Sequence, residues 1–141
     1  MADANEAPEG LLYTKTHQWF NPDNNRAGLT AYAADQLGEI SFVDVDPIEG
    51  EEVSQIEMDG DEPASDPLDA TVESSKAVGD IYAPVSGTIS AVNSDLLDFP
   101  EKVNEDPYGE GWLFEIEPSN LDGEKGNLHS AEEYKAFIAS L

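Results

Sequence analysis

Cysteine is absent from the 141 residues, and only six positions are lysine or arginine. Without cysteine the chain forms no disulfides and has no thiolate that binds a metal or attacks a substrate. The six basic residues face 31 acidic ones, so nucleic acid phosphates and anionic lipid heads are repelled. No apolar run is long enough to predict a membrane span. We therefore expect neither a nucleic acid nor a membrane partner, and any redox chemistry has to come from an attached group.

The acidic excess gives a formal net charge of -25 and is spread along the whole chain. Such a charge repels itself within a compact fold unless salt screens it. The screening length falls from about 8 Å at physiological ionic strength to about 3 Å at 1 M. Our leading hypothesis is adaptation to a salt-rich cytoplasm. The alternative, an acidic face that docks basic partners, stays open.

Length and a hydrophobic content of 39% predict one globular domain, which we place at 11–141. Residues 1–10 are acidic, contain proline and glycine and have little to bury, so we predict a disordered or loosely attached lead. They lack the basic start of a targeting leader, and we expect a cytoplasmic protein. Residues 57–70 are acidic, contain proline and show no hydrophobic period, which indicates an exposed loop insertion.

Many short apolar stretches separated by turn residues predict a mainly β fold, a flattened sandwich or barrel. We expect strands at 11–15, 18–20, 39–45, 52–57, 72–73, 80–82, 88–92 and 111–117.

Two short helices are also predicted. Thr30 is a suitable N-cap for a helix over 31–37, and Gly38 stands where a left-handed C-terminal residue is favoured. Ser130 and Glu133 form a capping-box pattern at the start of a C-terminal helix. Apolar residues recur there at helical spacing and should pack on the sheet: Tyr134, Phe137, Ile138 and Leu141.

Motifs for intrinsic catalysis or metal binding are weak. His17 and His129 lie far apart and have no cysteine partner. Neither a P-loop nor a dinucleotide-binding glycine pattern is present, and no Ser, His and Asp set matches a known catalytic spacing. We therefore predict that the protein is not an enzyme and holds no metal.

Lys76 is the most informative residue, because a chain with so few basic residues has placed one at a predicted hairpin tip. Its neighbours Ser74, Ser75, Ala77 and Gly79 are small and leave the ammonium group uncovered. Taken alone, Lys76 would be an ordinary surface lysine. Its surroundings are nevertheless those of a lysine that another enzyme has to reach.

The layout of this hairpin resembles that of lipoyl and biotinyl carrier domains. Gly87 follows Lys76 by eleven positions and is preceded by Ala83-Pro84-Val85-Ser86. Biotinyl domains usually flank the lysine with methionine, whereas Ser75 and Ala77 stand here, so the lipoyl branch fits better.

The resemblance extends to the glycine cleavage system H-protein family over five sequence blocks in the family's order. These blocks are Tyr13-Thr14-Lys15-Thr16-His17-Gln18-Trp19, Leu37-Gly38-Glu39-Ile40-Ser41-Phe42-Val43, Glu73-Ser74-Ser75-Lys76-Ala77, Ser86-Gly87 and the run from Val103 to Trp112. The resemblance implies a barrel-sandwich hybrid of lipoyl hammerhead type with short flanking helices and a C-terminal helix. It also implies lipoate as a covalent cofactor on Lys76, with Glu73, Ser74, Ser75, Ala77 and Gly87 as the attachment motif.

The implied function is a shuttle for the aminomethyl group of glycine. By resemblance, the pyridoxal phosphate enzyme glycine decarboxylase loads the lipoyl arm, and an aminomethyltransferase passes the one-carbon unit to tetrahydrofolate. Dihydrolipoyl dehydrogenase then restores the disulfide, and a separate lipoate-attaching enzyme installs the arm. Family members shelter the loaded arm in a surface cleft, for which Thr16, Gln18 and Asp80 are the matching positions.

The chain departs from the family pattern in three places. Ser75 replaces the usual valine, Gln18 replaces the usual glutamate, and the 57–70 insertion is longer than the usual connection. Gln18 keeps open a rival interpretation, a lipoyl relay protein that supplies lipoate to other dehydrogenase complexes. A third interpretation is an acidic interaction domain in which Lys76 stays unmodified.

Overall fold

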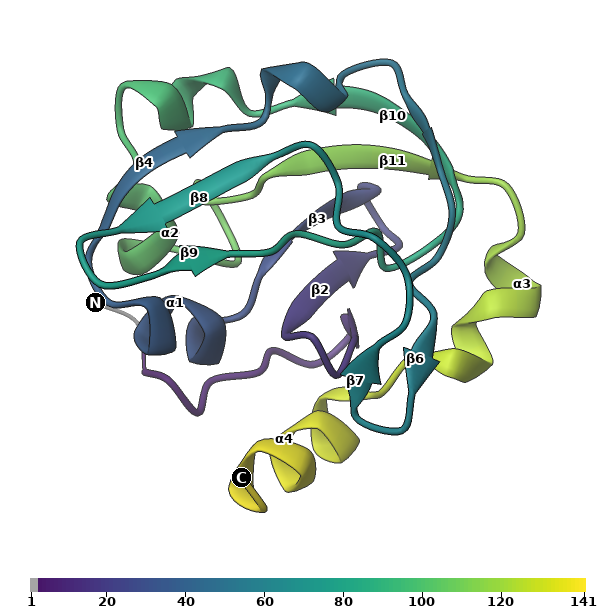
Figure 1. The fold of residues 1–141 in the computed structure, drawn as a ribbon. Helices are drawn as coiled ribbons and strands as arrows, with labels where there is room; N and C mark the ends of the chain where they lie inside the picture. Colours follow the sequence, from purple (N-terminus) through teal and green to yellow (C-terminus); the bar gives the residue numbers. More distant parts are fainter. Residues whose placement is uncertain (1–2) are drawn as a thin grey trace.

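The computed structural model describes residues 3–141, so the first two residues of the predicted lead lie outside it. Strands of this region form three antiparallel sheets (Figure 1). The largest has the order β1 (Leu12–Tyr13), β2 (Gln18–Asn21), β3 (Arg26–Leu29), β11 (Phe114–Pro118), β10 (Gly87–Val92) and β5 (Glu52–Val53). The second has the order β4 (Ile40–Asp44), β8 (Thr71–Ser74) and β9 (Val78–Gly79), and the third pairs β6 (Met58–Asp59) with β7 (Glu62–Pro63).

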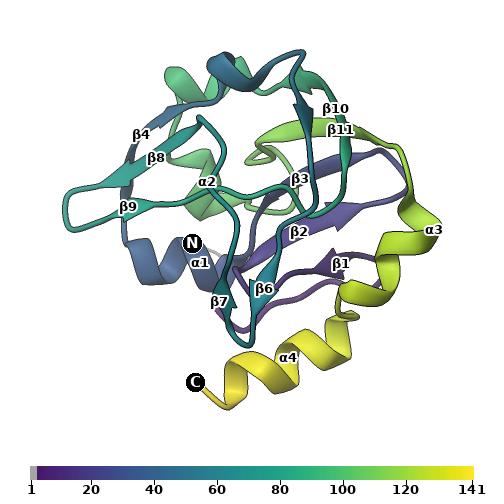
Figure 2. The ribbon, with the colours of Figure 1, turned by 45° about the vertical axis from the view of Figure 1, so that its right-hand side comes forward.

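Short helices connect and flank the sheets (Figure 2). The α-helices are α1 (Ala31–Leu37), α2 (Lys102–Glu105), α3 (Leu121–Glu124) and α4 (Ala131–Ala139). In the described part of the chain, three 3₁₀ turns accompany them: η1 (Asp46–Ile48), η2 (Ser94–Leu97) and η3 (Lys125–Asn127). Within residues 3–141, no helix has the length and apolarity needed to cross a membrane.

The main core joins the largest sheet to the three-stranded sheet. Phe20, Phe114 and Ile116 come from the former, and Val43 and Val72 come from the latter, all at most 1% exposed. A single cluster therefore holds the two sheets together as a sandwich. The predicted mainly β fold with short flanking helices is confirmed.

Both predicted helices are present with their caps. The Thr30 hydroxyl accepts from the backbone N–H of Ala33, and Gly38 ends α1 with a φ of 86°. The capping box of Ser130 and Glu133 is complete at the start of α4. Tyr134 is fully buried and stacks on Tyr13, with ring centroids 4.8 Å apart. Ser140 caps the helix before Leu141, which is 64% exposed and does not extend the packed stripe.

Several predicted strand boundaries differ from the structure, and some strands, β3 among them, were not predicted. The strands expected at 11–15, 52–57 and 111–117 are β1, β5 and β11, with shorter or shifted bounds. The strand expected at 80–82 is absent: β9 ends at Gly79, and the next residues run irregularly into the turn before β10. Residues 26–29 form β3, although Gly28 is a poor strand former. A Cβ at position 28 would lie 3.1 Å from the Trp19 indole, so the glycine allows close packing across the β2–β3 pair. Long-range packing here overrides local propensity.

The described part of the lead contacts the domain. Ala7 is 2% exposed, the Tyr108 hydroxyl donates to the Glu6 carbonyl at 2.6 Å, and the Tyr13 hydroxyl donates to the Pro8 carbonyl at 2.7 Å. The 57–70 segment carries the exposed β6–β7 hairpin, whose Asp61 forms an ion pair with Lys15 at 2.7 Å. The domain boundaries stay predictions.

Candidate functional site

Lys76 lies at the tip of the β8–β9 hairpin, which projects beside α1 (Figure 2). The tip is a tight turn, closed by a hydrogen bond from the Ser74 N–H to the Ala77 carbonyl at 2.9 Å. Ser75 and Lys76 occupy the two central positions of this turn, and both are exposed. The hairpin predicted around Lys76 is therefore present.

The Ser74 side chain organises the turn. Its hydroxyl donates to the Leu37 carbonyl at 2.5 Å. Its oxygen accepts from the backbone N–H groups of Lys76 at 3.3 Å and Ala77 at 3.1 Å. One side chain thus shapes the turn and fastens it to the C-terminal end of α1.

That end of α1 is itself held from a second element. The buried Asn104 of α2 donates from its amide to the Gly38 carbonyl at 2.9 Å and accepts from the Ile40 N–H at 2.8 Å. The support under the hairpin is therefore built from residues in α1, α2 and the start of β4. Sequence reasoning did not find Asn104, because nothing local marks an asparagine as a partner of a backbone so far away in the chain.

The Lys76 side chain lies over Gly38. A Cβ at position 38 would be 2.8 Å from Lys76 Cε and 3.5 Å from Nζ. The ammonium group therefore lies near the carbonyl end of a helix, where the backbone dipoles favour a cation. None of the four ion pairs found in residues 3–141 includes Lys76. The amine is accessible and is not occupied by a carboxylate.

The other residues of the predicted attachment motif occupy different parts of the fold. Glu73 is half-buried on β8, and Ala77 packs against the edge of the main core. Gly87 begins β10, where an added Cβ would overlap the Glu117 carbonyl oxygen. Gly87 therefore allows β10 and β11 to approach closely, and it is part of the framework rather than of the hairpin tip.

The turn before Gly87 is held by a residue that sequence reasoning missed. The carboxylate of Glu124 accepts from the Ser86 N–H at 2.7 Å and from the Ser86 hydroxyl at 2.5 Å. The Ser86 oxygen in turn accepts from the Gln55 N–H at 2.8 Å. The signal for this contact is absent from the local sequence, where Glu124 is one of many acids.

Of the three predicted cleft residues, Thr16 and Gln18 are in direct contact. Gln18 is 1% exposed; with its amide oriented to satisfy both ends, it donates to Thr16 Oγ1 at 3.0 Å and to the Tyr82 carbonyl at 3.1 Å. Its oxygen accepts from the Tyr82 N–H at 2.9 Å. Asp80 is exposed two positions before Tyr82. The Gln18 amide therefore joins β2 to the segment that follows Lys76.

A polar cavity of about 860 Å³ lies between the β6–β7 hairpin and the segment after α3. Its lining includes Thr14, Gln55 and Glu124, but not Thr16, Gln18 or Asp80. The sheltering role of those three residues stays a prediction.

His17 lies in a half-buried aromatic pocket. Its backbone is left-handed, with a φ of 67°. Nδ1 is 2.8 Å from the Tyr134 hydroxyl, and the ring centroid is 4.6 Å from that of Tyr32. Burial lowers the pKa of His17 to about 4, because the charged imidazolium loses water. Within residues 3–141, no three His, Asp or Glu side chains gather in a way that would hold a metal ion.

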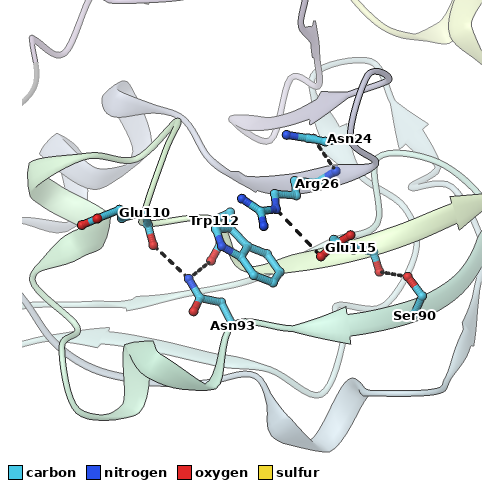
Figure 3. Close-up of polar contacts among 7 residues, drawn as sticks. All are labelled: Asn24, Arg26, Ser90, Asn93, Glu110, Trp112 and Glu115. Atoms are coloured by element: carbon cyan, nitrogen blue, oxygen red, sulfur yellow. Dashed lines mark hydrogen bonds and ion pairs between the residues drawn. The ribbon is translucent and has the colours of Figure 1, made fainter.

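A second region of the surface combines an aromatic ring with acidic side chains. The Arg26 guanidinium lies 4.4 Å from the centre of the Trp112 ring, and its Nε is 3.8 Å from Glu115 (Figure 3). Asn93 donates to the carbonyls of Glu110 at 2.9 Å and Trp112 at 2.8 Å. These contacts fix the strand ends beside a cavity of about 520 Å³, where the lysine that lines it, Lys102, is ion-paired with Glu110. Of the two regions, the Lys76 hairpin is therefore the better candidate for a modified lysine.

Comparison with known proteins covers nearly the whole chain. Residues 11–141 match the model of the family described as glycine cleavage H-protein. The chain is 42% identical over 136 residues to the probable glycine cleavage system H protein of Natronomonas pharaonis, and the alignment covers 95% of this chain and 98% of that protein. It is 44% identical over 133 residues to the glycine cleavage system H protein of Oceanobacillus iheyensis, with 93% and 96% covered.

A solved structure supports the same relationship. The crystal structure of a glycine cleavage system H protein from Mycobacterium marinum superimposes with a TM-score of 0.73. It is 33% identical in sequence and covers 94% of this chain and 99% of that one.

Proposed function

The chain belongs to the glycine cleavage H-protein family, and from this premise we propose that Lys76 carries lipoate in an amide bond and that the arm shuttles the aminomethyl group of glycine. The lipoyl carrier role in glycine cleavage follows from the family. The assignment of the arm to Lys76, and of particular residues around it, is the proposal.

The observation that carries the assignment is the construction of the hairpin tip. Lys76 is exposed in a turn that Ser74 fastens to α1, and none of the described ion pairs uses its amine. A lysine that has to enter another protein's active site needs an accessible amine on a rigid base. The described residues around Lys76 fit this requirement, so the hairpin suits covalent loading.

Lipoate supplies a disulfide that accepts the aminomethyl group and is later regenerated by thiol–disulfide exchange, chemistry for which this cysteine-free chain has no residue of its own. The chain provides the base of the arm. Amide formation removes the Lys76 charge. It therefore also removes the attraction of the ammonium group to the carbonyl end of α1, and the arm is released from Gly38.

The proposed partners are glycine decarboxylase, the aminomethyltransferase and dihydrolipoyl dehydrogenase. A tethered group reaches an effective concentration on the order of mM at a partner's active site, so each transfer is local once the carrier is bound. We propose that it is a non-catalytic subunit. The names of its relatives do not favour the relay function.

Between partners the loaded arm needs protection from water, and we retain Thr16, Gln18 and Asp80 as the region that shelters it. The exposed Asp80 carboxylate is the one group of the three that is free to accept from a charged amine. Gln18 would act indirectly, because its amide fixes the Tyr82 backbone two positions after Asp80.

The first test is the intact mass of the protein purified from its native host, with fragment sequencing of the peptide that contains Lys76. We expect an increase of one lipoyl group on this residue. In a reconstituted system the loaded protein should restore exchange between glycine and carbon dioxide by glycine decarboxylase, and Lys76→Arg should not. Native protein with an unmodified Lys76 would refute the assignment, and loaded protein that fails to support exchange would favour the relay function.

A further inference from the structure

Three side chains form a row across the outer face of the three-stranded sheet, next to the hairpin tip. Phe42 of β4 is paired with Glu73 of β8, and Glu73 is paired with Val78 of β9. Directly paired residues of antiparallel strands point to the same face of a sheet. The order is apolar, acidic, apolar, and we call these three residues the hairpin row.

The burial of neighbouring pairs shows that the row faces outward. Val72 and its partner Val43 are both fully buried, so their side chains occupy the core face. Phe42 is 40% exposed and Val78 is 67% exposed. With strands about 4.8 Å apart, the row is about 10 Å wide. Val78 lies two positions after Lys76, and Phe42 is paired with Glu73, which lies three positions before Lys76.

The central carboxylate of the row has no cation beside it. None of the four ion pairs found in the described part of the chain involves Glu73. The complementary surface is therefore an apolar patch interrupted by one lysine or arginine. Apolar contact would supply most of the binding, and the charge pair would set the register of the two surfaces.

We propose that the hairpin row is the docking surface for the enzyme that acylates Lys76. This inference rests on the proposed function. An attaching enzyme reacts at Nζ itself and has to cover the surface beside the hairpin. Enzymes that act on the loaded arm react at its far end, so their chemistry does not require contact with β4 or β9. The row therefore fits the attaching enzyme better than any later partner.

The reaction that the row serves is a simple acyl transfer. The neutral amine of Lys76 attacks the carbonyl carbon of an activated lipoyl donor, and a new C–N bond forms. The bond to the donor's leaving group breaks, the leaving group keeps the electron pair, and the amine's proton passes to solvent. The three residues of the row touch none of these atoms; they position the hairpin.

The experiment measures acylation of full-length, unmodified protein by a lipoate-attaching enzyme supplied with lipoyl-adenylate, with intact mass as the readout. The variants are Phe42→Ser, Val78→Ser and the double variant. Phe99→Ser is the matched control, because Phe99 is 52% exposed but lies at the second cavity instead of on the row. Thermal midpoints establish that each variant is folded.

We expect each single variant to lower kcat/KM about fivefold and the double variant at least about tenfold, mainly through a higher KM. Phe42→Leu should restore most of the loss, and Phe99→Ser should match the wild type. Unchanged acylation of the folded double variant would overturn the inference. So would normal acylation combined with slower glycine–carbon dioxide exchange, because the row would then serve the decarboxylase. A wild-type protein that is not acylated at all would instead remove the premise, the proposed function.

Discussion

Protonation of His17 is expected to destabilise the fold as the pH falls from 7.5 to 5. The folded protein keeps His17 neutral in its aromatic pocket, where burial lowers its pKa from the ordinary 6.5 to about 4. The unfolded chain binds a proton near pH 6.5, so its free energy falls relative to that of the folded state as the pH drops below that value. The stabilisation is complete above about pH 6.5 and is lost toward pH 4.

The size of the effect follows from the two pKa values. Between pH 7.5 and 5, the loss from His17 alone is about 2 kcal/mol of unfolding free energy. Protonation of carboxylates in the same range relieves self-repulsion and works in the opposite direction. The contribution of His17 therefore has to be read from the difference between the wild type and a variant that does not titrate.

His17→Asn is the suitable variant, because asparagine tolerates the left-handed backbone that position 17 requires. Urea unfolding would be followed by the fluorescence of Trp19, which is 1% exposed, at fixed ionic strength. The stability of the wild type relative to the variant should fall by about 2 kcal/mol from pH 7.5 to 5. A difference that stays constant, or an NMR titration of His17 near pH 6.5, would refute the reasoning.

Three further predictions concern the hairpin, the buried amide and the charge. Ser74→Ala should speed hydrogen exchange at the Lys76 and Ala77 amides, because the free energy of local opening falls by about 1 kcal/mol. Ser75→Ala should leave this exchange unchanged. Equal exchange in both variants would contradict the anchoring role. Gln18→Glu should lower the urea midpoint at pH 8 by the equivalent of about 1–3 kcal/mol, because a carboxylate cannot donate to the Tyr82 carbonyl. The exposed Gln36→Glu, as control, should stay near the wild type. The midpoint temperature of thermal unfolding should rise from dilute buffer to molar KCl, and an unchanged midpoint would refute the salt-adaptation hypothesis.

The features predicted from the sequence are those with local signals. The caps of α1 and α4 depend on residues three positions apart, and the structure has both. The exposed turn around Lys76 depends on small residues in one short segment. Local patterns also place most strands, because the alternation of apolar and polar residues along a strand does not depend on which strand it pairs with.

The features that escaped prediction depend on residues far apart in the chain. Ser74 was expected in the attachment motif, but its bond to Leu37 spans 37 positions and no local pattern encodes it. The capture of Ser86 by Glu124 spans 38 positions. Gln18 is predicted in a strand and as a cleft residue, but its burial against the Tyr82 backbone depends on a contact 64 positions away in the chain. Their roles emerge only when the sheets are assembled.

Recognition of the hairpin has to work on a protein that is acidic throughout. At a net charge of -25, long-range attraction brings a basic partner to any part of the surface and does not single out the hairpin. In molar salt such attraction is screened to about 3 Å, so Glu73 acts only in direct contact. Apolar burial at Phe42 and Val78 is not weakened by this screening. A row with one carboxylate between two apolar side chains therefore combines affinity that tolerates salt with a charge that fixes the register. The KM for acylation of Lys76 should accordingly change little when KCl is raised.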